Sequence, residues 1–439
     1  MLKLTNFFKW GNTEMKRMII QGGNRLSGEV TIGGAKNSTV ALIPAAILAD
    51  TPVQFDTVPD ILDVHNLMII LKSMNVKSEF SHGVLDIDPT QIIEAELPSK
   101  AIKSLRASYY FMGALLGRFH RATLTFPGGD NIGPRPIDQH LKAFKALGAT
   151  VSENHGTVHL EAANGLHGAR IFLDMVSVGA TINAILAAVR AEGTTVIENA
   201  AREPEIIDLA TFLNNMGAKI RGVGTDTIRI TGVSTLQSMN THTIIADRIE
   251  SGTYLALAAA LGDGVMIHNV IPEHLESFTS KMIEMGVDLQ IDSDKIYVPK
   301  TTKLKPVHVK TMPFPGFATD LQQPLTPLMS LADGDSVIVD TIYPKRVKHV
   351  PELQKMGMRI EAHDGTIIVK HTDHLHGANV SAGEIRAGAA LTIAGLMADG
   401  TTVINNAGNI LRGYDRIVWK LNRLHANVSI EDDSSVKIS

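Results

Sequence analysis

Apolar and polar residues repeat along this chain at intervals of 68 to 73 residues. In each copy, apolar residues at helical spacing end at a Met or Leu. A Gly, Asn or His follows, and then a small or apolar residue. The six copies lie at 71–76, 144–149, 213–218, 282–287, 353–358 and 421–426. Gly or Asn directly after an apolar helical pattern predicts the end of a helix, so the repeat predicts six helices that end at corresponding positions.

A second pattern has the same period. An alanine-rich helical segment runs into a turn and then into a strand of β-branched residues, at 187–199, 330–340 and 395–406. Weaker copies lie near 46–56, 114–126 and 258–269. Alternating residues after the helix ends, as in 151–154 and 157–161, predict hairpins. Each unit is therefore predicted to contain a strand, a helix, a strand, a loop, a helix and a strand pair.

Six such units form two sets of three, which predicts a mixed α/β (α+β) fold. We expect two globular domains, each made of three βαβαββ repeats around a pseudo-threefold axis, with helices at the centre and sheets as walls. The expected limits are 18–36 plus 246–439 for domain I and 37–245 for domain II, after an N-terminal extension at 1–17. Because interdomain clefts are favoured ligand sites, the site is expected between the domains.

Composition narrows the function. The 439 residues include 41 Lys+Arg and 45 Asp+Glu, a balance that argues against a nucleic-acid or membrane-surface binder. Cysteine is absent, which excludes disulfides, thiolate metal sites and a cysteine nucleophile. The first 17 residues lack the apolar core of a signal peptide, and no apolar stretch is long enough to span a membrane. We therefore expect a cytoplasmic protein with small-molecule substrates.

The first helix of each unit is predicted to begin with polar or charged residues. These positions are Lys36–Asn37, Arg106, Ser177/Gly179, Asp247/Arg248, Asp320 and Glu384/Arg386. Ser177 and Asp247 are interpreted as helix caps. Lysine or arginine is disfavoured at a helix N-terminus unless an anion lies near, so Lys36, Arg106 and Arg386 predict an anion site, above all for phosphate.

Three loops carry further candidates. The loop 127–138 holds three glycines and three prolines together with Asp130 and Arg135, and is interpreted either as a lid over the cleft or as an ordinary surface turn. The corresponding loops carry Arg346 and Arg412.

A histidine group, His371, His374 and His376, has spacing that could suit a metal. However, His376-Gly-Ala has a counterpart in His167-Gly-Ala of another repeat, which favours the start of a strand. We expect no metal site.

With its six repeats and the ordered motifs GGAKN, RAS, PGG-x-x-x-G-x-RP-x-D, VSVGAT, PGF-x-TD and RGYDRI, the chain resembles the enolpyruvyl transferases over about residues 18–439. The resemblance implies transfer of the enolpyruvyl group of phosphoenolpyruvate to the 3-hydroxyl of UDP-N-acetylglucosamine, with release of phosphate and no metal or organic cofactor. This reaction is the first committed step of peptidoglycan synthesis, which serves cell shape and cell division.

The resemblance also assigns residues. It implies catalytic roles for Asp130, Asp320, Lys36 and Arg412, where Asp320 takes the sugar hydroxyl proton. It implies substrate contacts for Lys36, Asn37, Arg106, Arg135, Pro136, Ile137, Asp138, Gln139, Val176, Ser177, Val178, Gly179, Asp320, Ile342, Arg346, Glu384, Arg386 and Arg412.

Three positions depart from the family pattern. Asp130 stands where many members carry cysteine, Met175 where many carry lysine, and Glu384 where aspartate is common. The loop cysteine is the thiol that fosfomycin alkylates, so the chain is expected to be insensitive to that drug. A non-catalytic UDP-sugar-binding paralogue and an EPSP-synthase-like transferase remain as alternatives.

Overall fold

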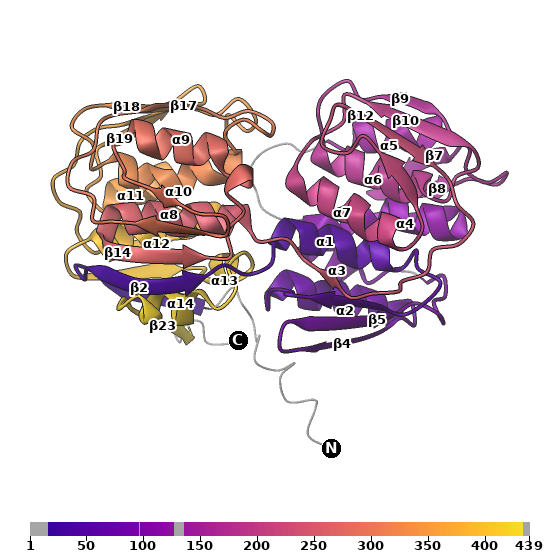
Figure 1. The fold of residues 1–439 in the computed structure, drawn as a ribbon, viewed down its shortest axis with the longest axis horizontal. Coiled ribbons are helices and arrows are strands. Elements are labelled where there is room, and N and C mark those ends of the chain that lie inside the picture. The colour runs from indigo at the N-terminus through magenta and orange to yellow at the C-terminus, as the bar shows by residue number, and fades with distance from the viewer. Residues whose placement is uncertain (1–15, 96, 127–135, 433–439) are drawn as a thin grey trace, which may run out of the picture. The chain divides into compact units, whose positions relative to one another are not determined.

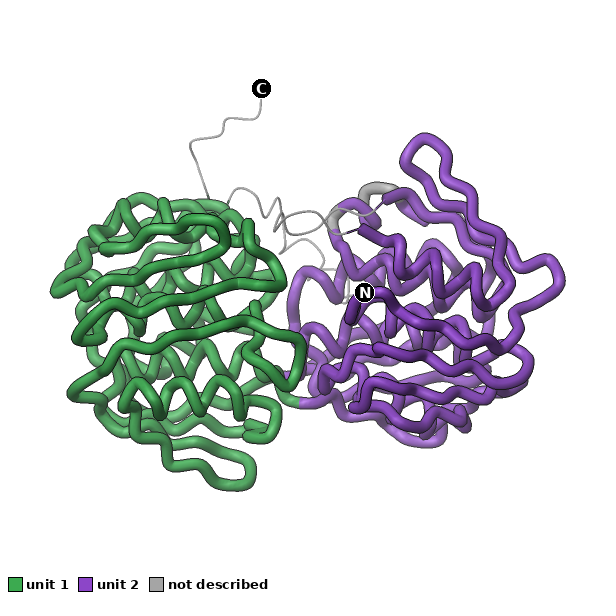
Figure 2. Tube along the Cα trace, turned by 90° about the horizontal axis from the view of Figure 1, so that it is seen from above, with its two compact units in different colours: residues 1–33, 131–133, 246–439 green, residues 34–130, 134–245 purple. Residues whose placement is uncertain are grey.

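The computed structural model describes residues 16–95, 97–126 and 136–432. They form two compact units (Figure 2). Within the described residues, unit 1 comprises 16–33 and 246–432, and unit 2 comprises 34–95, 97–126 and 136–245. The chain therefore passes from unit 1 to unit 2 between Gly33 and Gly34 and returns between Ile245 and Ala246.

Both crossings are fixed by hydrogen bonds within their own unit. In unit 1, the Asp247 N–H donates to the carbonyl of Gly33 at 3.0 Å. The Gly33 N–H donates to Glu250 at 2.8 Å, and the same carboxylate pairs with the buried Lys420 at 2.6 Å. In unit 2, the Ala35 N–H donates to the carbonyl of Ile245 at 2.7 Å.

Three helices at the centre of unit 2 are buried on nearly all faces, because most of their own residues are small or apolar. They are α1 (Lys36–Ala46), α4 (Tyr110–Phe119) and α6 (Val178–Ala188). The other helices are α2 (Leu62–Ser73), α3 (Ser99–Ser104), η2 (Arg106–Tyr109), α5 (Asp138–Ala146) and α7 (Pro204–Asn215). Gly113 lets α4 approach α6 closely, since a Cβ there would lie 2.5 Å from the carbonyl oxygen of Asn183.

The sheets of unit 2 lie around these helices (Figure 1). One sheet has the order β13-β3-β5-β4, with β3 (Val53–Asp56), β4 (Lys77–Ser81), β5 (Val84–Asp88) and β13 (His242–Thr243). A second has the order β6-β8-β7, with β6 (Arg121–Thr125), β7 (Thr150–Asn154) and β8 (Thr157–Glu161). The third has the order β11-β12-β10-β9, with β9 (Arg170–Phe172), β10 (Thr194–Glu198), β11 (Lys219–Arg221) and β12 (Thr227–Thr231).

Unit 1 repeats this plan. Its buried central helices are α8 (Arg248–Leu261), α10 (Thr319–Met329) and α12 (Ile385–Met397). The other helices are η3 (Pro272–His274), α9 (Glu276–Glu284), α11 (His349–Lys355), α13 (Gly408–Leu411) and α14 (Ile417–Arg423). The sheet order β15-β16-β14-β2 joins β2 (Leu26–Thr31), β14 (Gly262–His268), β15 (Gln290–Ile291) and β16 (Lys295–Val298). The order β17-β18-β20-β19 joins β17 (His308–Lys310), β18 (Ser336–Val339), β19 (Ile360–His363) and β20 (Thr366–Val369).

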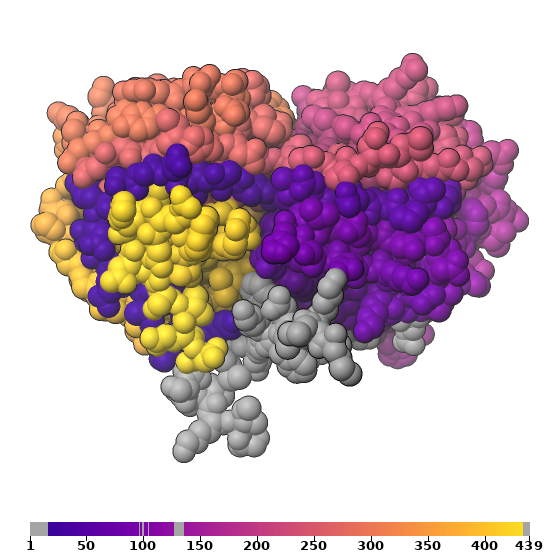
Figure 3. Space-filling view, turned by 60° about the horizontal axis from the view of Figure 1, so that its bottom comes forward, coloured from indigo at the N-terminus to yellow at the C-terminus, as the bar shows by residue number. Residues whose placement is uncertain are grey.

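The last sheet of unit 1 unites the two ends of the described chain. Its order is β21-β22-β1-β23, with β1 (Lys16–Gln21), β21 (Asn379–Ser381), β22 (Thr401–Asn405) and β23 (Asn427–Asp432). Figure 3 shows the N-terminal segment in indigo against the C-terminal segment in yellow. β1 begins at Lys16, within the predicted extension, because Lys16 and Arg17 lie opposite the acidic Asp432 and Glu431.

The six predicted helix ends are confirmed. The residues at positions 75, 148, 217, 286, 357 and 425 all have positive φ, between 61° and 105°. In each case the next residue donates its N–H back to the carbonyl five residues earlier, as Val76 does to Leu71 at 3.0 Å and Ala426 to Leu421 at 3.2 Å. This is the Schellman arrangement that a left-handed residue permits.

The repeat fails in one place. The sheet formed by β6, β7 and β8 has three described strands, whereas each of the other five sheets has four. The segment that would supply the fourth strand folds instead as α3 and η2. The sequence there, Pro98-Ser-Lys-Ala-Ile-Lys-Ser, lacks the alternation of a strand, and proline precedes the first helical residue.

Candidate active site

Lys36 is the first residue of α1, and the anion expected beside it comes from the protein itself. Its Nζ lies 3.0 Å from a carboxylate oxygen of Asp63, which is fully buried in the first turn of α2. Asn37 follows, half-buried, on the same helix start. Asp63 therefore fixes the Lys36 ammonium. This role could not be predicted from sequence, because Asp63 looks like an ordinary first-turn carboxylate.

A buried polar cluster connects the start of α1 to α7 and β13. The Ser38 hydroxyl donates to Asp208 of α7, and His242 Nε2 lies 2.9 Å from the other oxygen of the same carboxylate. Ser38 is fully buried, and Asp208 and His242 are 4% and 8% exposed. The cluster fixes α1 to α7 and β13, and so fixes the position of Lys36.

Arg106 and His140 form a second group in unit 2. The guanidinium of Arg106 lies 4.8 Å from the ring centroid of Tyr109, and this ring lies 5.7 Å from that of His140. Burial of the imidazole, aided by the charge of Arg106, lowers the pKa of His140 to about 4. His140 is therefore neutral at physiological pH.

The segment Pro136 to Gln139, expected to contact substrate, runs into the start of α5. Pro136 and Asp138 are exposed, while Ile137 and Gln139 are buried. The Gln139 amide donates to Asp138 at 2.7 Å and to Asp174 at 3.1 Å, and its oxygen accepts from the Asp174 N–H at 2.8 Å. The side chain of Gln139 thus holds the loop before α6 in place. Ile137 and Asp138 line a pocket of about 570 Å³.

The segment Val176 to Gly179 begins α6. Ser177 Oγ accepts a hydrogen bond from the Ala180 N–H at 3.2 Å, which confirms the interpretation of Ser177 as a cap. Asp247 caps α8 in the same way, accepting from Ile249 at 2.8 Å and Glu250 at 3.0 Å. Met175 and Val176 are 58% and 38% exposed. The described surface here is an apolar approach to a helix N-terminus.

Unit 1 brings four candidate residues into one ion network. Arg346 Nη1 lies 2.6 Å from Asp320, at the start of α10, and Arg346 Nη2 lies 2.8 Å from Glu384. Arg386 Nε lies 3.3 Å from the second oxygen of Asp320. The side chains of Arg346 and Glu384 are 2% and 0% exposed, whereas that of Asp320 is 27% exposed. Asp320 is therefore the most exposed member of this network.

The network keeps Asp320 ionised. Burial by itself would raise the pKa of Asp320, but the charges of Arg346 and Arg386 outweigh it and hold that pKa well below its usual range. Glu384 is bonded to Arg346 and also accepts from Gln323 Nε2 at 2.8 Å. We therefore place Glu384 as the residue that positions Arg346.

The remaining described candidates in unit 1 lie on loops near this network. The Ile342 N–H donates to Asp340 at 2.9 Å, which shapes the turn after β18. Arg412 is half-buried at the end of α13, which packs on α12. Tyr414 stacks on Arg386, with 5.2 Å from the guanidinium carbon to the ring centroid. Asp130 and Arg135 lie outside the described residues.

The histidines considered for a metal have other roles. His167 and His376 each form a single parallel bridge, to Glu192 and Asp399, just before β9 and β21. This confirms that they are equivalent strand starts. His371 is bonded to Asp373 and to the carbonyl of Ala332. Across 16–95, 97–126 and 136–432, no group of three or more His, Cys, Asp or Glu is arranged to hold a metal ion.

In the described chain, none of the helices has both the length and the apolar character to span a bilayer.

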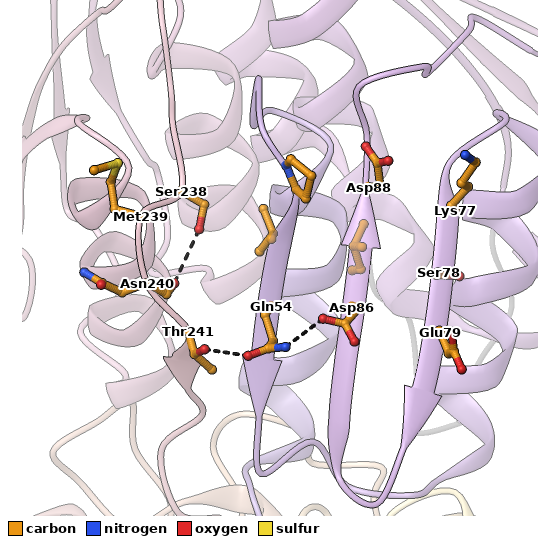
Figure 4. Close-up of a pocket in the computed structure, with 13 residues that line it drawn as sticks. Gln54, Lys77, Ser78, Glu79, Asp86, Asp88, Ser238, Met239, Asn240 and Thr241 are labelled. Carbon is orange, nitrogen blue, oxygen red and sulfur yellow. Dashed lines mark hydrogen bonds between the residues drawn. The ribbon is translucent and has the colours of Figure 1, made fainter.

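A separate groove of about 500 Å³ lies over β3, β4 and β5 of unit 2 (Figure 4). Gln54 donates to Asp86 at 2.8 Å there and accepts from Thr241 at 2.6 Å. None of the described candidate site residues lines this groove.

Two buried histidines predict acid sensitivity of the fold. Burial and the neighbouring Arg346 lower the pKa of His349 to about 3, and the pKa of His140 is about 4. Because the unfolded chain binds these protons near pH 6.5 and the folded chain does not, stability present above pH 6.5 is lost as the pH falls towards 4. Each histidine should cost about 2 kcal/mol of unfolding free energy at pH 5.

Denaturant unfolding from pH 7 to pH 5 checks this prediction. Between pH 7 and pH 5 the His349→Gln variant should lose about 2 kcal/mol less unfolding free energy than the parent. Glu250, whose pKa is raised by burial, acts in the opposite direction, so the comparison is between variant and parent. Equal pH dependence in both proteins would contradict the prediction.

Comparison with known proteins adds to this geometry. The sequence profile of EPSP synthase (3-phosphoshikimate 1-carboxyvinyltransferase) matches residues 20–421. The chain belongs to the EPSP synthase family. The resemblance to the enolpyruvyl transferases is thereby confirmed.

Similar relatives are named for UDP-N-acetylglucosamine, not for the 3-phosphoshikimate in the name of the family profile. A UDP-N-acetylglucosamine 1-carboxyvinyltransferase 2 of Lactiplantibacillus plantarum is 71% identical over 423 residues, which cover 96% of this chain and 99% of that relative. A UDP-N-acetylglucosamine 1-carboxyvinyltransferase 1 of Streptococcus agalactiae is 55% identical, covering 95% of this chain and 100% of the relative.

Solved structures of the family confirm the two-domain α/β fold. The enolpyruvyl transferase NikO of Streptomyces tendae superimposes with a TM-score of 0.87 at 27% identity, over 95% of this chain and 99% of that one. EPSP synthase of Acinetobacter baumannii gives a TM-score of 0.72 at 18% identity, over 95% and 100%. The second likeness is one of fold alone.

Proposed function

We propose that this protein transfers the enolpyruvyl group of phosphoenolpyruvate to the 3-hydroxyl of UDP-N-acetylglucosamine and releases phosphate. The observation that carries the acceptor assignment is the 71% identity to a relative named for that activity, over nearly the whole of both chains. The reaction would be the first committed step of peptidoglycan synthesis, and it would take place in the cytoplasm. It would support cell shape and cell division.

The cations at the candidate positions of each unit suit the two anionic substrates. Lys36 and Arg106 belong to helix starts of unit 2, and Arg346, Arg386 and Arg412 belong to unit 1. Arg386 is 2% exposed, yet its Nη1 has no hydrogen-bond partner among the described residues. A buried guanidinium nitrogen without an acceptor is costly, so this atom favours an anionic ligand oxygen. We assign Arg386 to phosphoenolpyruvate.

The first step of the proposed reaction is an addition. The sugar 3-hydroxyl oxygen forms a bond to C2 of phosphoenolpyruvate, and the hydroxyl proton passes to Asp320. A proton from Asp130 is added to C3, so the carbon–carbon double bond becomes a single bond. The adduct carries a methyl group, a carboxylate and phosphate on one carbon. Lys36 and Arg412 would stabilise the negative charge of the phosphate.

The second step is an elimination. The bond from C2 to the phosphate oxygen breaks, a proton of the methyl group returns to the Asp130 carboxylate, and the double bond forms again in the enolpyruvyl ether. Phosphate departs as the other product. Asp130 must therefore be protonated for the addition, although the cations that bind the substrate anions would favour its ionised form. The negative charges of bound phosphoenolpyruvate would raise its pKa again.

The ion network of unit 1 makes Asp320 a weak base before substrate binds. A carboxylate with a very low pKa is a weak base, and here two arginines stabilise its charge. When a substrate anion binds Arg386, this guanidinium shares its charge with the ligand, so the pKa of Asp320 rises. Arg346 is kept from compensating, because Glu384 holds it with bonds at 2.8 to 3.2 Å. Phosphoenolpyruvate would thus make Asp320 a better base.

Glu384 provides a test of this arrangement. We expect Glu384→Gln to lower kcat about 10-fold or more, because Arg346 would then give its whole charge to Asp320. The variant should also lose about 3 kcal/mol of unfolding free energy, since a buried arginine loses one of its two carboxylates. Glu384→Asp is the matched control, because it keeps the charge. Steady-state kinetics showing equal kcat for the Gln and Asp variants would contradict the positioning role.

Two alternative functions are separated by one experiment. Phosphate release from phosphoenolpyruvate is measured with UDP-N-acetylglucosamine, with shikimate 3-phosphate, and without acceptor. We expect phosphate release when UDP-N-acetylglucosamine is the acceptor, and none with shikimate 3-phosphate or without acceptor. Release with shikimate 3-phosphate would indicate the EPSP synthase reaction. Binding of UDP-N-acetylglucosamine in a calorimeter, with no release under any condition, would indicate a non-catalytic binding protein.

A further inference from the structure

His140 is a buried histidine outside the residues assigned above. It is 5% exposed on α5, and its Nδ1 lies 2.9 Å from Nδ2 of Asn183 on α6. Asn183 Oδ1 accepts the N–H of Gly113 at 2.8 Å. A backbone N–H can only donate, so the amide oxygen of Asn183 must face Gly113. Its NH2 group therefore faces His140.

This arrangement fixes the tautomer of the ring. An amide NH2 can only donate, so Nδ1 of His140 must be the acceptor nitrogen. In the neutral ring the hydrogen then lies on Nε2. Burial and the charge of Arg106 favour the neutral ring at physiological pH. His140 thus presents a single N–H donor whose orientation is set by Asn183.

The Nε2 edge of the ring lies against the start of α6. A Cβ built on Gly179 would stand 2.8 Å from Cε1 and 3.0 Å from Nε2 of His140. Gly179 is the second residue of α6, so glycine is required for the ring to lie this close to the first turn. The N–H groups of a first turn have no carbonyl partner within their own helix. The imidazole N–H therefore lies beside a helix start that favours anions.

A third donor completes the group. Arg106, stacked on Tyr109, lies near enough to His140 for its charge to affect the ring. The guanidinium, the helix start and a neutral N–H donor all favour a negatively charged oxygen. Met175 adds no cation to this group and is 58% exposed.

We infer that His140 binds the diphosphate of the nucleotide sugar by donating its Nε2 hydrogen to a phosphate oxygen, with Asn183 as its positioning residue. The inference rests on the proposed function for the identity of the ligand. As a fixed neutral donor, His140 contributes to nucleotide-sugar binding in both the ground state and the transition state. Its loss should change KM for UDP-N-acetylglucosamine and leave kcat unchanged.

Two substitutions separate a donor role from a structural one. The amide of His140→Asn reaches the place of Nδ1, so it keeps the partner Asn183 and loses the Nε2 donor. The amide of His140→Gln reaches the place of Nε2, so it keeps a donor and loses the bond to Asn183. We expect the Asn variant to raise KM for UDP-N-acetylglucosamine about 10-fold, and the Gln variant to restore most of the affinity.

The controls are kcat and KM for phosphoenolpyruvate, which should stay within about twofold in the Asn variant. An Asn variant with unchanged KM for the nucleotide sugar, or a Gln variant with the larger defect, would overturn the inference. If the parent releases no phosphate, the proposed function fails. If the parent is active and the Asn variant matches it, the role of His140 alone fails.

A further test uses the unaltered protein, so it does not depend on whether a variant folds. In nitrogen NMR spectra of the histidine-labelled protein, Nε2 of His140 should carry the proton. Its resonance should shift when UDP-N-acetylglucosamine is added, and should stay in place with N-acetylglucosamine, which lacks the diphosphate. A proton on Nδ1, or no shift with the nucleotide sugar, would contradict the inference.

Discussion

Replacement of Asp320 by asparagine should lower kcat by about 10²- to 10⁴-fold, the range for loss of a general base. The amide has the shape of the carboxylate but cannot take the proton of the sugar hydroxyl. Arg346 and Arg386, at 2.6 and 3.3 Å, lose the charge that they share. The binding of UDP-N-acetylglucosamine, which depends on many other contacts, should change less than about 10-fold.

Asp50 offers a matched control for this substitution. It too is a partly exposed carboxylate held by two arginines, Arg118 at 2.9 Å and Arg190 at 2.8 Å, but it lies among structural residues of unit 2. The side chains of Asp50 and Asp320 are 31% and 27% exposed. We expect Asp50→Asn to lower the melting temperature and leave kcat unchanged. A kcat of Asp320→Asn within about 10-fold of the parent would contradict the base role.

The second large effect is expected at Asp130. Asp130→Ala should lose most turnover, about 10²-fold or more, and should keep binding of UDP-N-acetylglucosamine, because the proton for C3 is removed and the nucleotide-sugar contacts are not. Turnover assays and calorimetry on the same preparation measure both. Equal turnover in the variant would contradict the acid role.

Inactivation by fosfomycin provides a chemical test of the residue at position 130. A thiolate opens the epoxide by forming a sulfur–carbon bond while the carbon–oxygen bond breaks and the oxygen takes up a proton. A carboxylate is a much weaker nucleophile, so the parent should keep its activity after incubation with the drug. Asp130→Cys should be inactivated with time. Time-dependent inactivation of the parent would contradict the proposal.

Much of the fold was predictable because helix ends leave a local signature. The six positions from Asn75 to His425 were predicted as helix stops from sequence, and each has the left-handed conformation. Ser177 and Asp247 were predicted as caps for the same local reason. In contrast, α3 and η2 replace the expected strand, since their local sequence outweighs the repeat pattern.

The contacts within the site were harder to predict because they join distant segments. Lys36 was expected to bind a ligand anion, and its partner Asp63 could not be predicted because it comes from a different helix. Glu384 was expected to contact substrate, and its bonds to Arg346 and Gln323 could not be predicted from any local pattern. The tautomer of His140 depends on Asn183, and no local pattern links the two. Sequence thus indicated charged helix starts, and packing determined which charges are paired.

The product of the reaction tests the central claim most directly. The protein is incubated with phosphoenolpyruvate and UDP-N-acetylglucosamine in heavy water, and the nucleotide sugar is then analysed by mass spectrometry and proton NMR. The account predicts an enolpyruvyl ether at the 3-position, formed in equal amount with phosphate, with deuterium in its vinyl group because C3 passes through a methyl stage. Unmodified nucleotide sugar after prolonged incubation, or phosphate released without the ether, would contradict it.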